Sequence, residues 1–112
     1  MDPLKQKFFE KSNALRNELK TLLAENGELS AGSVTLNQIF GGARGIKMML
    51  WETSELDAME GIRFRGYSIP ELRRLLPREP NGIEPKPEGL FWLMLVGEIP
   101  TDEEVAWLTD QF

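Results

Sequence analysis

The chain has 112 residues, of which 41% are hydrophobic and 28% are charged, and a formal charge of -5 at pH 7. That length fits one small globular domain or part of a larger one, and the acidic balance argues against a nucleic-acid partner. The absence of cysteine excludes disulfides, thiol nucleophiles and thiolate metal sites, and the absence of histidine excludes mechanisms that need its near-neutral pKa within this chain.

The first residues carry no targeting pattern. Residues 1–7 have neither the apolar core of a signal peptide nor the arginine-rich character of a presequence. No apolar run approaches the length needed to span a bilayer, so no membrane partner is expected. We therefore predict a cytoplasmic protein of bacterial type.

A long amphipathic helix is predicted over about residues 4–26. Its apolar residues recur at three-, four- and seven-residue intervals, and they are Leu4, Phe8, Leu15, Leu19, Leu22 and Leu23. Asp2-Pro3 provides a start signal and Asn26-Gly27 a stop signal. We expect the apolar stripe to be buried against other elements, with a calmodulin-like or membrane-surface role as the alternative.

A glycine-rich turn is predicted at residues 41–45, after a loop at residues 28–33 and a short strand at residues 34–36. Such a turn exposes backbone N–H groups, and the guanidinium of Arg44 adds a forked, permanently charged donor. Arg44 is therefore a candidate phosphate contact. The alternative is a plain turn with a solvated arginine, since the motif is short and lacks the spacing of a P-loop.

A small β ribbon is predicted over about residues 48–65. Apolar and aromatic content predicts one strand over residues 48–53, and β-prone side chains predict its partner over residues 62–65. The connection, residues 54–60, is acidic, but its carboxylates do not have the spacing of a calcium loop. We expect it to be a solvated loop, and we expect no metal site in the chain.

The ribbon is followed directly by a helix start. Gly66 permits a tight turn, Ser68 is a natural N-cap, and Glu71 stands three residues later, as a capping box requires. A helix is predicted over about residues 69–76, with Leu72, Leu75 and Leu76 as its buried stripe. Four prolines between residues 77 and 87 then predict a stiff surface connection.

Two further helices are predicted over about residues 88–97 and 101–112. The first is apolar on nearly all sides, which indicates a buried helix. The second begins after Thr101, an N-cap residue, and Glu104 three residues later is expected to complete a capping box with it. The chain ends at Phe112, within the predicted helix over residues 101–112 and without the glycine that commonly ends a helix. We therefore expect a truncated sequence.

Several collinear segments cover most of residues 34–112 and resemble one family. They are residues 41–45, Trp51-Glu52-Thr53-Ser54 with Leu56-Asp57, residues 60–71, and residues 87–93 with 97–101. Together they resemble citrate synthase, and the amino-acid sequence of residues 69–71 and 87–101 resembles its eukaryotic-type branch. The resemblance implies a mainly α fold in which residues 1–112 form the N-terminal portion of the helical large domain, with a small antiparallel β ribbon.

The resemblance also implies an activity for a longer parent. Citrate synthases are homodimeric acyltransferases that condense acetyl-CoA with oxaloacetate at the entry to the tricarboxylic acid cycle, using two histidines and an aspartate. This chain has no histidine, and the family's aspartate lies far downstream, so none of Asp2, Asp57, Asp102 or Asp110 inherits its role. We therefore expect no catalytic residues and no activity in the chain alone.

The implied site residue is Arg44, which resembles a residue that contacts a phosphate of coenzyme A. Coenzyme A and acetyl-CoA are substrates of the parent, and no tightly bound cofactor is expected. Arg63 and Arg65 are expected to fix the ribbon to its neighbours. The expected partners are the remainder of the parent chain and, because apolar surface would be exposed, further copies of this chain. A stand-alone acidic helical interaction module is the alternative.

Overall fold

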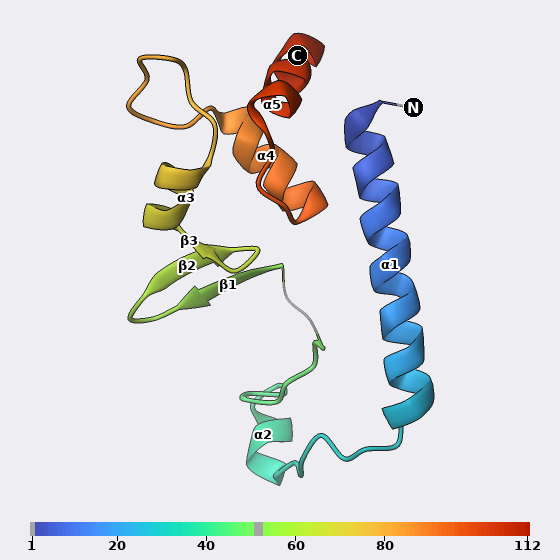
Figure 1. Ribbon diagram of the computed structural model, residues 1–112. Coiled ribbons are helices and arrows are strands. Elements are labelled where there is room, and N and C mark those ends of the chain that lie inside the picture. The colour runs from blue at the N-terminus through green and yellow to red at the C-terminus, as the bar shows by residue number, and fades with distance from the viewer. Residues whose placement is uncertain (1, 51–52) are drawn as a thin grey trace. The chain divides into compact units, whose positions relative to one another are not determined.

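A computed structural model describes residues 2–50 and 53–112. Within these residues it contains five helices and a three-stranded antiparallel sheet, which confirms the mainly α class with a small ribbon (Figure 1). The elements are α1 (Pro3–Asn26), α2 (Leu36–Phe40), β1 (Ser54–Asp57), β2 (Gly61–Phe64), β3 (Tyr67–Ser68), α3 (Ile69–Leu75), α4 (Pro87–Val96) and α5 (Asp102–Gln111). None of the described helices is long and apolar enough to cross a membrane.

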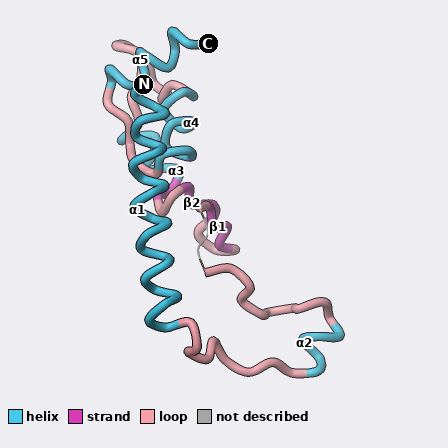
Figure 2. Tube along the Cα trace, turned by 90° about the vertical axis from the view of Figure 1, so that its right-hand side faces the viewer, coloured by secondary structure: helices cyan, strands magenta, loops and turns pink. Residues whose placement is uncertain are grey.

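The chain divides into two compact units. The first unit contains Met1–Ala14 and Thr53–Phe112, and the second contains Leu15–Glu52. The long helix α1 therefore starts in the first unit and ends in the second. In the second unit, loops and turns dominate the chain after α1, with α2 as a short helix among them (Figure 2).

The sheet has the order β1-β2-β3, and its first strand lies later in the chain than predicted. Residues 48–50 form no strand, whereas Trp51 and Glu52 lie outside the described residues. β1 instead occupies part of the predicted acidic connection and pairs with β2 from Ser54 opposite Phe64 to Asp57 opposite Gly61. Cross-strand pairing, rather than local apolar content, decides where an exposed edge strand forms.

The predicted strand at residues 34–36 is also wrong, because these residues lead into α2. The Thr35 hydroxyl accepts a hydrogen bond from the Gln38 N–H at 3.2 Å, and the Gln38 side-chain oxygen accepts one from the Thr35 N–H at 2.9 Å. This reciprocal capping box satisfies two amides at the helix start. It outweighs the β propensity of Val34 and Thr35, which suggested a strand.

The predicted junction between ribbon and helix is confirmed. The Ser68 hydroxyl accepts from the Glu71 N–H at 3.4 Å, and the Ser68 N–H donates to Glu71 Oε2 at 2.7 Å. α3 begins immediately after this cap and ends at Leu75, because Leu76 is extended. Helical geometry is disfavoured for a residue that precedes a proline, and Leu76 precedes Pro77.

The buried core lies entirely in the first unit, as far as the structure describes the chain. One cluster contains Leu72, Leu76 and Leu93, and the other contains Trp92, Val96 and Leu108. The predicted burial of Leu75 is wrong, because this residue is 43% exposed. Because α4 supplies Leu93 to one cluster and Trp92 to the other, its predicted burial is confirmed. Its last turn ends at Gly97, whose φ of 85° provides a left-handed C-cap.

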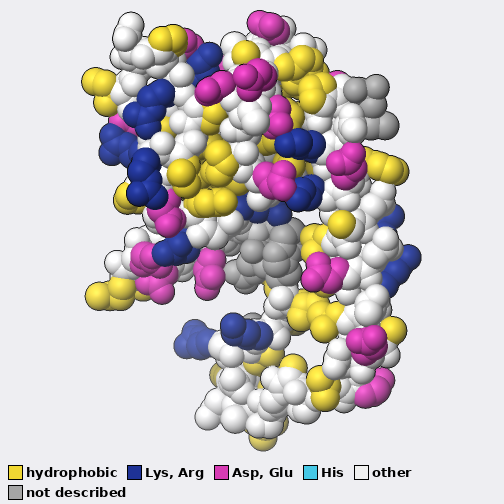
Figure 3. All heavy atoms as spheres, in the orientation of Figure 1, with side chains coloured by type: hydrophobic (Ala, Val, Ile, Leu, Met, Phe, Trp, Pro, Cys, Tyr) yellow, Lys and Arg dark blue, Asp and Glu magenta, His cyan; other side chains and the backbone are white. Residues whose placement is uncertain are grey.

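The predicted burial of the α1 stripe is not found, although the helix itself is. No residue of α1 is buried, and Leu4 is the residue that packs, partly buried, on the second cluster. Phe8 is 48% exposed and Leu23 is 60% exposed. Figure 3 accordingly shows hydrophobic side chains at the surface along α1.

Candidate functional site

The turn that carries Arg44 follows α2 directly. Gly42 and Gly45 both have a φ of 72°, and Ala43 has a φ of 67°, so the chain turns through a left-handed segment. Glycine adopts that conformation at little cost, whereas Ala43 is strained in it. The predicted tight turn at residues 41–45 is confirmed.

The amides of this turn are less available to an anion than the sequence suggests. The Gly41 N–H donates to the Asn37 carbonyl at 3.0 Å, and the Gly42 N–H donates to the Ile39 carbonyl at 3.0 Å. The Arg44 N–H donates to the Gln38 carbonyl at 3.2 Å. These three donors close the turn onto α2, so an anion there would have to bind mainly through side chains.

The side chain of Arg44 is exposed and folds back over the turn. A Cβ atom placed on Gly41 would lie 3.4 Å from Arg44 Cβ and 3.8 Å from its Nε, so the arginine lies within van der Waals reach of Gly41. Within the described residues, no salt bridge or side-chain hydrogen bond involves the Arg44 guanidinium. It is therefore free to bind an external carboxylate or phosphate as a forked donor.

A hollow of about 610 Å³ lies beside the turn, within the second unit. Gly45, Ile46 and Lys47 form part of its wall, together with residues 31–34, Gln38 and residues 48–50. Lys47 is exposed and adds a second cation near the turn. Lys47 was not among the predicted site residues, and its one signal in the sequence is its position three residues after Arg44.

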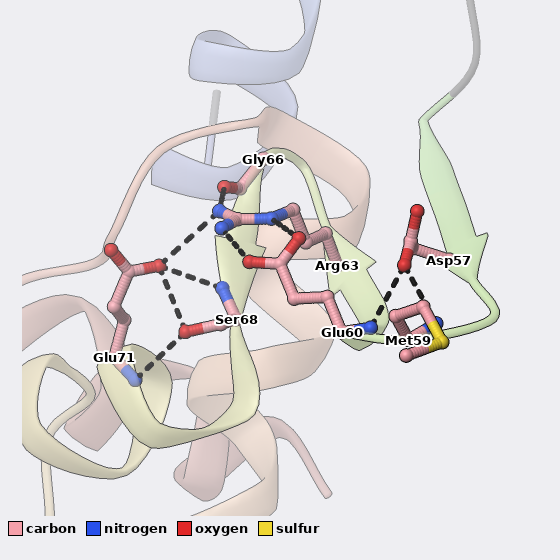
Figure 4. Close-up of polar contacts among 7 residues, drawn as sticks. All are labelled: Asp57, Met59, Glu60, Arg63, Gly66, Ser68 and Glu71. Atoms are coloured by element: carbon pink, nitrogen blue, oxygen red, sulfur yellow. Dashed lines mark hydrogen bonds and ion pairs between the residues drawn. The ribbon is translucent and has the colours of Figure 1, made fainter.

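The other arginines of interest have structural roles, as expected. Arg63 Nη1 donates to the Gly66 carbonyl at 2.8 Å, and Arg63 Nε donates to Glu60 Oε2 at 3.0 Å (Figure 4). From the adjacent turn, Arg65 Nη2 donates to the Met94 carbonyl at 2.7 Å and Arg65 Nε donates to the same oxygen at 3.1 Å. Arg63 thus braces the ribbon, and Arg65 joins it to the end of α4.

Three carboxylates around the ribbon, those of Asp57, Glu60 and Glu71, are engaged in hydrogen bonds. Asp57 Oδ1 accepts from the Glu60 and Met59 N–H groups, each at 2.8 Å, and these bonds lower the Asp57 pKa (Figure 4). The hydrogen bond from Arg63 lowers the pKa of Glu60, and the bonds from Ser68 lower the pKa of Glu71. Lowered pKa values make these groups poorer proton acceptors, which is the opposite of what a general base needs.

The predicted role of Glu104 in a capping box is not observed. The Thr101 hydroxyl caps α5 by accepting from the Glu104 N–H at 3.2 Å, but the Glu104 carboxylate pairs with Lys7 Nζ at 2.8 Å. Among the described residues, no group of three or more acidic side chains could hold a metal ion. Arg44 therefore remains the candidate contact for a ligand.

No family model matches the chain, but curated relatives do. It is 53% identical over 109 residues to a mitochondrial citrate synthase of Aspergillus niger and 50% identical over 109 residues to one of Neurospora crassa. Each match includes 97% of this chain and 23% of the relative. A mitochondrial citrate synthase of Xiphias gladius is 47% identical over 97 residues, which are 87% of this chain and 21% of that protein.

These relatives confirm the family resemblance and contradict the predicted localisation. All of the relatives named above are described as mitochondrial, which opposes a cytoplasmic protein of bacterial type. The cytoplasmic prediction rested on residues 1–7. Because the chain spans less than a quarter of the length of these relatives, its first residues give no information about a leader.

Proposed function

The chain is a homologue of the citrate synthases over about a quarter of their length, and on that premise we propose that it is a scaffold segment of such an enzyme. The complete protein would condense acetyl-CoA with oxaloacetate in mitochondria. This chain would supply the N-terminal part of its large domain. The observation that carries the proposal is the 53% identity over 97% of the chain.

The chemistry would come from residues outside this chain. The family's mechanism uses histidine, which this chain lacks, and the carboxylates of Asp57, Glu60 and Glu71 are engaged in holding the ribbon and α3. The segment's own contribution to substrate binding would be Arg44, whose exposed guanidinium suits a phosphate of coenzyme A. No observation favours the alternative of a stand-alone interaction module.

An assay of citrate formation tests this assignment. The purified chain is expected to produce no citrate from acetyl-CoA and oxaloacetate, whereas the full-length protein that contains this segment turns over. Release of the coenzyme A thiol can be followed with a thiol reagent, because the chain has no cysteine to give a background. Sustained turnover by the chain alone contradicts the proposal.

The same assay tests the role of Arg44 in the full-length protein. Arg44→Gln is expected to raise KM for acetyl-CoA by about tenfold to a hundredfold, since a charge-assisted hydrogen bond contributes on the order of 1.5–3 kcal/mol. KM for oxaloacetate should not change. Arg16→Gln, on the exposed surface of α1, is the matched control. An unchanged KM for acetyl-CoA rules out the proposed contact.

Self-association is also proposed for the isolated chain. Phe40 is 95% exposed and Leu36 is 84% exposed, both on α2, and Phe112 is 79% exposed. Apolar surface of this extent is normally covered by further protein. The proposed partners are the remainder of the parent chain or, in its absence, further copies of this one.

Light scattering and binding of an apolar-surface dye measure this association. The chain is expected to form oligomers at high concentration and to bind the dye, and Leu36→Gln with Phe40→Gln should reduce both signals. Ser30→Gln, in the exposed loop before α2, serves as the control. A clean monomer without dye binding at high concentration rejects the proposal.

A further inference from the structure

Charged side chains hold the first turns of α1 against the other helices of the first unit. Lys7 Nζ lies 2.8 Å from Glu104 Oε1 on α5 and 3.8 Å from Glu98 Oε2, just after α4. Lys11, one turn further along α1, also pairs with Glu98. The docking of this helix therefore depends on ion pairs made by two lysines on one face.

The apolar part of this contact is small. Leu4 lies on the same face as Lys7 and packs, partly buried, on the cluster of Trp92, Val96 and Leu108. No residue of α1 is buried, so the helix gains little from apolar burial. Removing the ion pairs would leave Leu4 as the main attachment.

The ion pairs are open to solvent. The side chains of Lys7, Lys11 and Glu98 are 37%, 50% and 42% exposed, so dissolved salt can screen them. The hydrogen bond to Glu104 raises the pKa of Lys7, and the hydrogen bond from Lys11 lowers the pKa of Glu98. Both directions agree with pairs that favour the charged forms and that weaken when charge is screened.

The docked arrangement also has a cost. Trp92 Nε1 and Glu104 Oε2 are buried, and neither has a hydrogen-bond partner within the part of the chain that the structure describes. Both belong to residues at the docking site: Glu104 binds Lys7, and Trp92 belongs to the cluster under Leu4. Departure of α1 takes Lys7 away from Glu104 and would let water reach that carboxylate, which offsets part of the docking energy.

We propose that residues 3–14 form a releasable strap, which is docked on α4 and α5 by Lys7 and Lys11 and detaches as ionic strength rises. Release uncovers the side of the Trp92, Val96 and Leu108 cluster that Leu4 occupies. The strap is a property of the chain itself and does not depend on the enzymatic assignment.

Electron-spin distance measurements test the strap directly. Because the chain has no cysteine, Phe9→Cys on α1 and Ala106→Cys on α5 provide two unique labelling positions, both exposed. At about 10 mM salt we expect one narrow distance distribution. At about 1 M sodium chloride, where the screening length falls to about 3 Å, a longer and broader population should appear. The ratio of docked to released molecules should fall about fivefold or more.

Charge variants distinguish a strap from general unfolding. Lys7→Gln with Lys11→Gln should produce the longer population already at low salt. Lys5→Gln, which removes a lysine that pairs locally with Asp2 just before α1, should not. Exchanging the charges, Lys11→Glu with Glu98→Lys, should restore part of the docked population relative to Lys11→Glu alone. A single unchanged distribution at both salt concentrations and in the Lys7 and Lys11 variant overturns the proposal, and so does failure of the exchange to restore docking.

Discussion

Leu93→Ala is expected to destabilise the first unit by about 3 kcal/mol, within the range of about 2–5 kcal/mol for buried leucines. Leu93 has no exposed surface, and it packs with Leu72 and Leu76 of the α3 region. Truncation removes apolar burial and leaves a cavity that close-packed neighbours fill only partly. Small domains have little stability in reserve, so a large part of the total would be lost.

Urea unfolding followed by far-ultraviolet circular dichroism measures this loss. Leu95→Ala is a matched control, because Leu95 lies two residues further along the same helix and is 39% exposed. It is expected to change the free energy of unfolding by less than about 1 kcal/mol. Equal unfolding midpoints for the two variants would show that Leu93 is not in the core.

Arg65→Ala is expected to cost about 2 kcal/mol, although the residue lies in a surface turn. Its guanidinium donates to the Met94 carbonyl through Nε and Nη2, at the end of α4 where carbonyl groups lack partners within the helix. A cation is favoured there by the helix dipole, and charge-assisted hydrogen bonds are stronger than neutral ones. The change therefore removes the link between the ribbon and α4.

Three substitutions at this position separate the side chain from the backbone. Arg65 has a φ of 52° and precedes Gly66, whose φ is 88°, in the two-residue turn between β2 and β3. Glycine relieves the strain of a positive φ, so Arg65→Gly should lose less stability than Arg65→Ala but more than Arg65→Lys, which keeps the charge.

Urea unfolding also ranks these variants. Arg74→Ala, on the exposed surface of α3, is the control and should lie close to the unchanged chain. If Arg65→Gly is as stable as the unchanged chain, the bonds to Met94 contribute nothing. If Arg65→Ala and Arg74→Ala have the same midpoint, the proposed link between ribbon and helix is wrong.

Features set by neighbouring residues were predicted well. The Ser68 and Glu71 capping box, the Thr101 cap and the glycine end of α4 are local arrangements, which a sequence reveals through residue type and spacing. The same holds for the extent of α1, which lies within one residue of its predicted bounds. Even so, the Thr-x-x-Gln signal at Thr35 was overlooked in favour of β propensity.

Features set by distant residues were not predictable in the same way. The position of β1 depends on pairing with β2, and the Arg65 bond joins residues 29 positions apart. For the candidate site, the glycine turn and Arg44 were visible in the sequence. The use of the Gly41, Gly42 and Arg44 amides inside the turn depends on the preceding helix, which was not predicted, since a strand was expected over residues 34–36.

The position of α4 between the two clusters has a consequence for how the first unit comes apart. Leu93 belongs to one cluster, while Trp92 and Val96 belong to the other, so a single helix is common to both. A displacement of α4 that opens one cluster therefore also disturbs the packing of the other. The two clusters therefore form one cooperative unit, in which loss of order beside α3 is transmitted through α4 to α5.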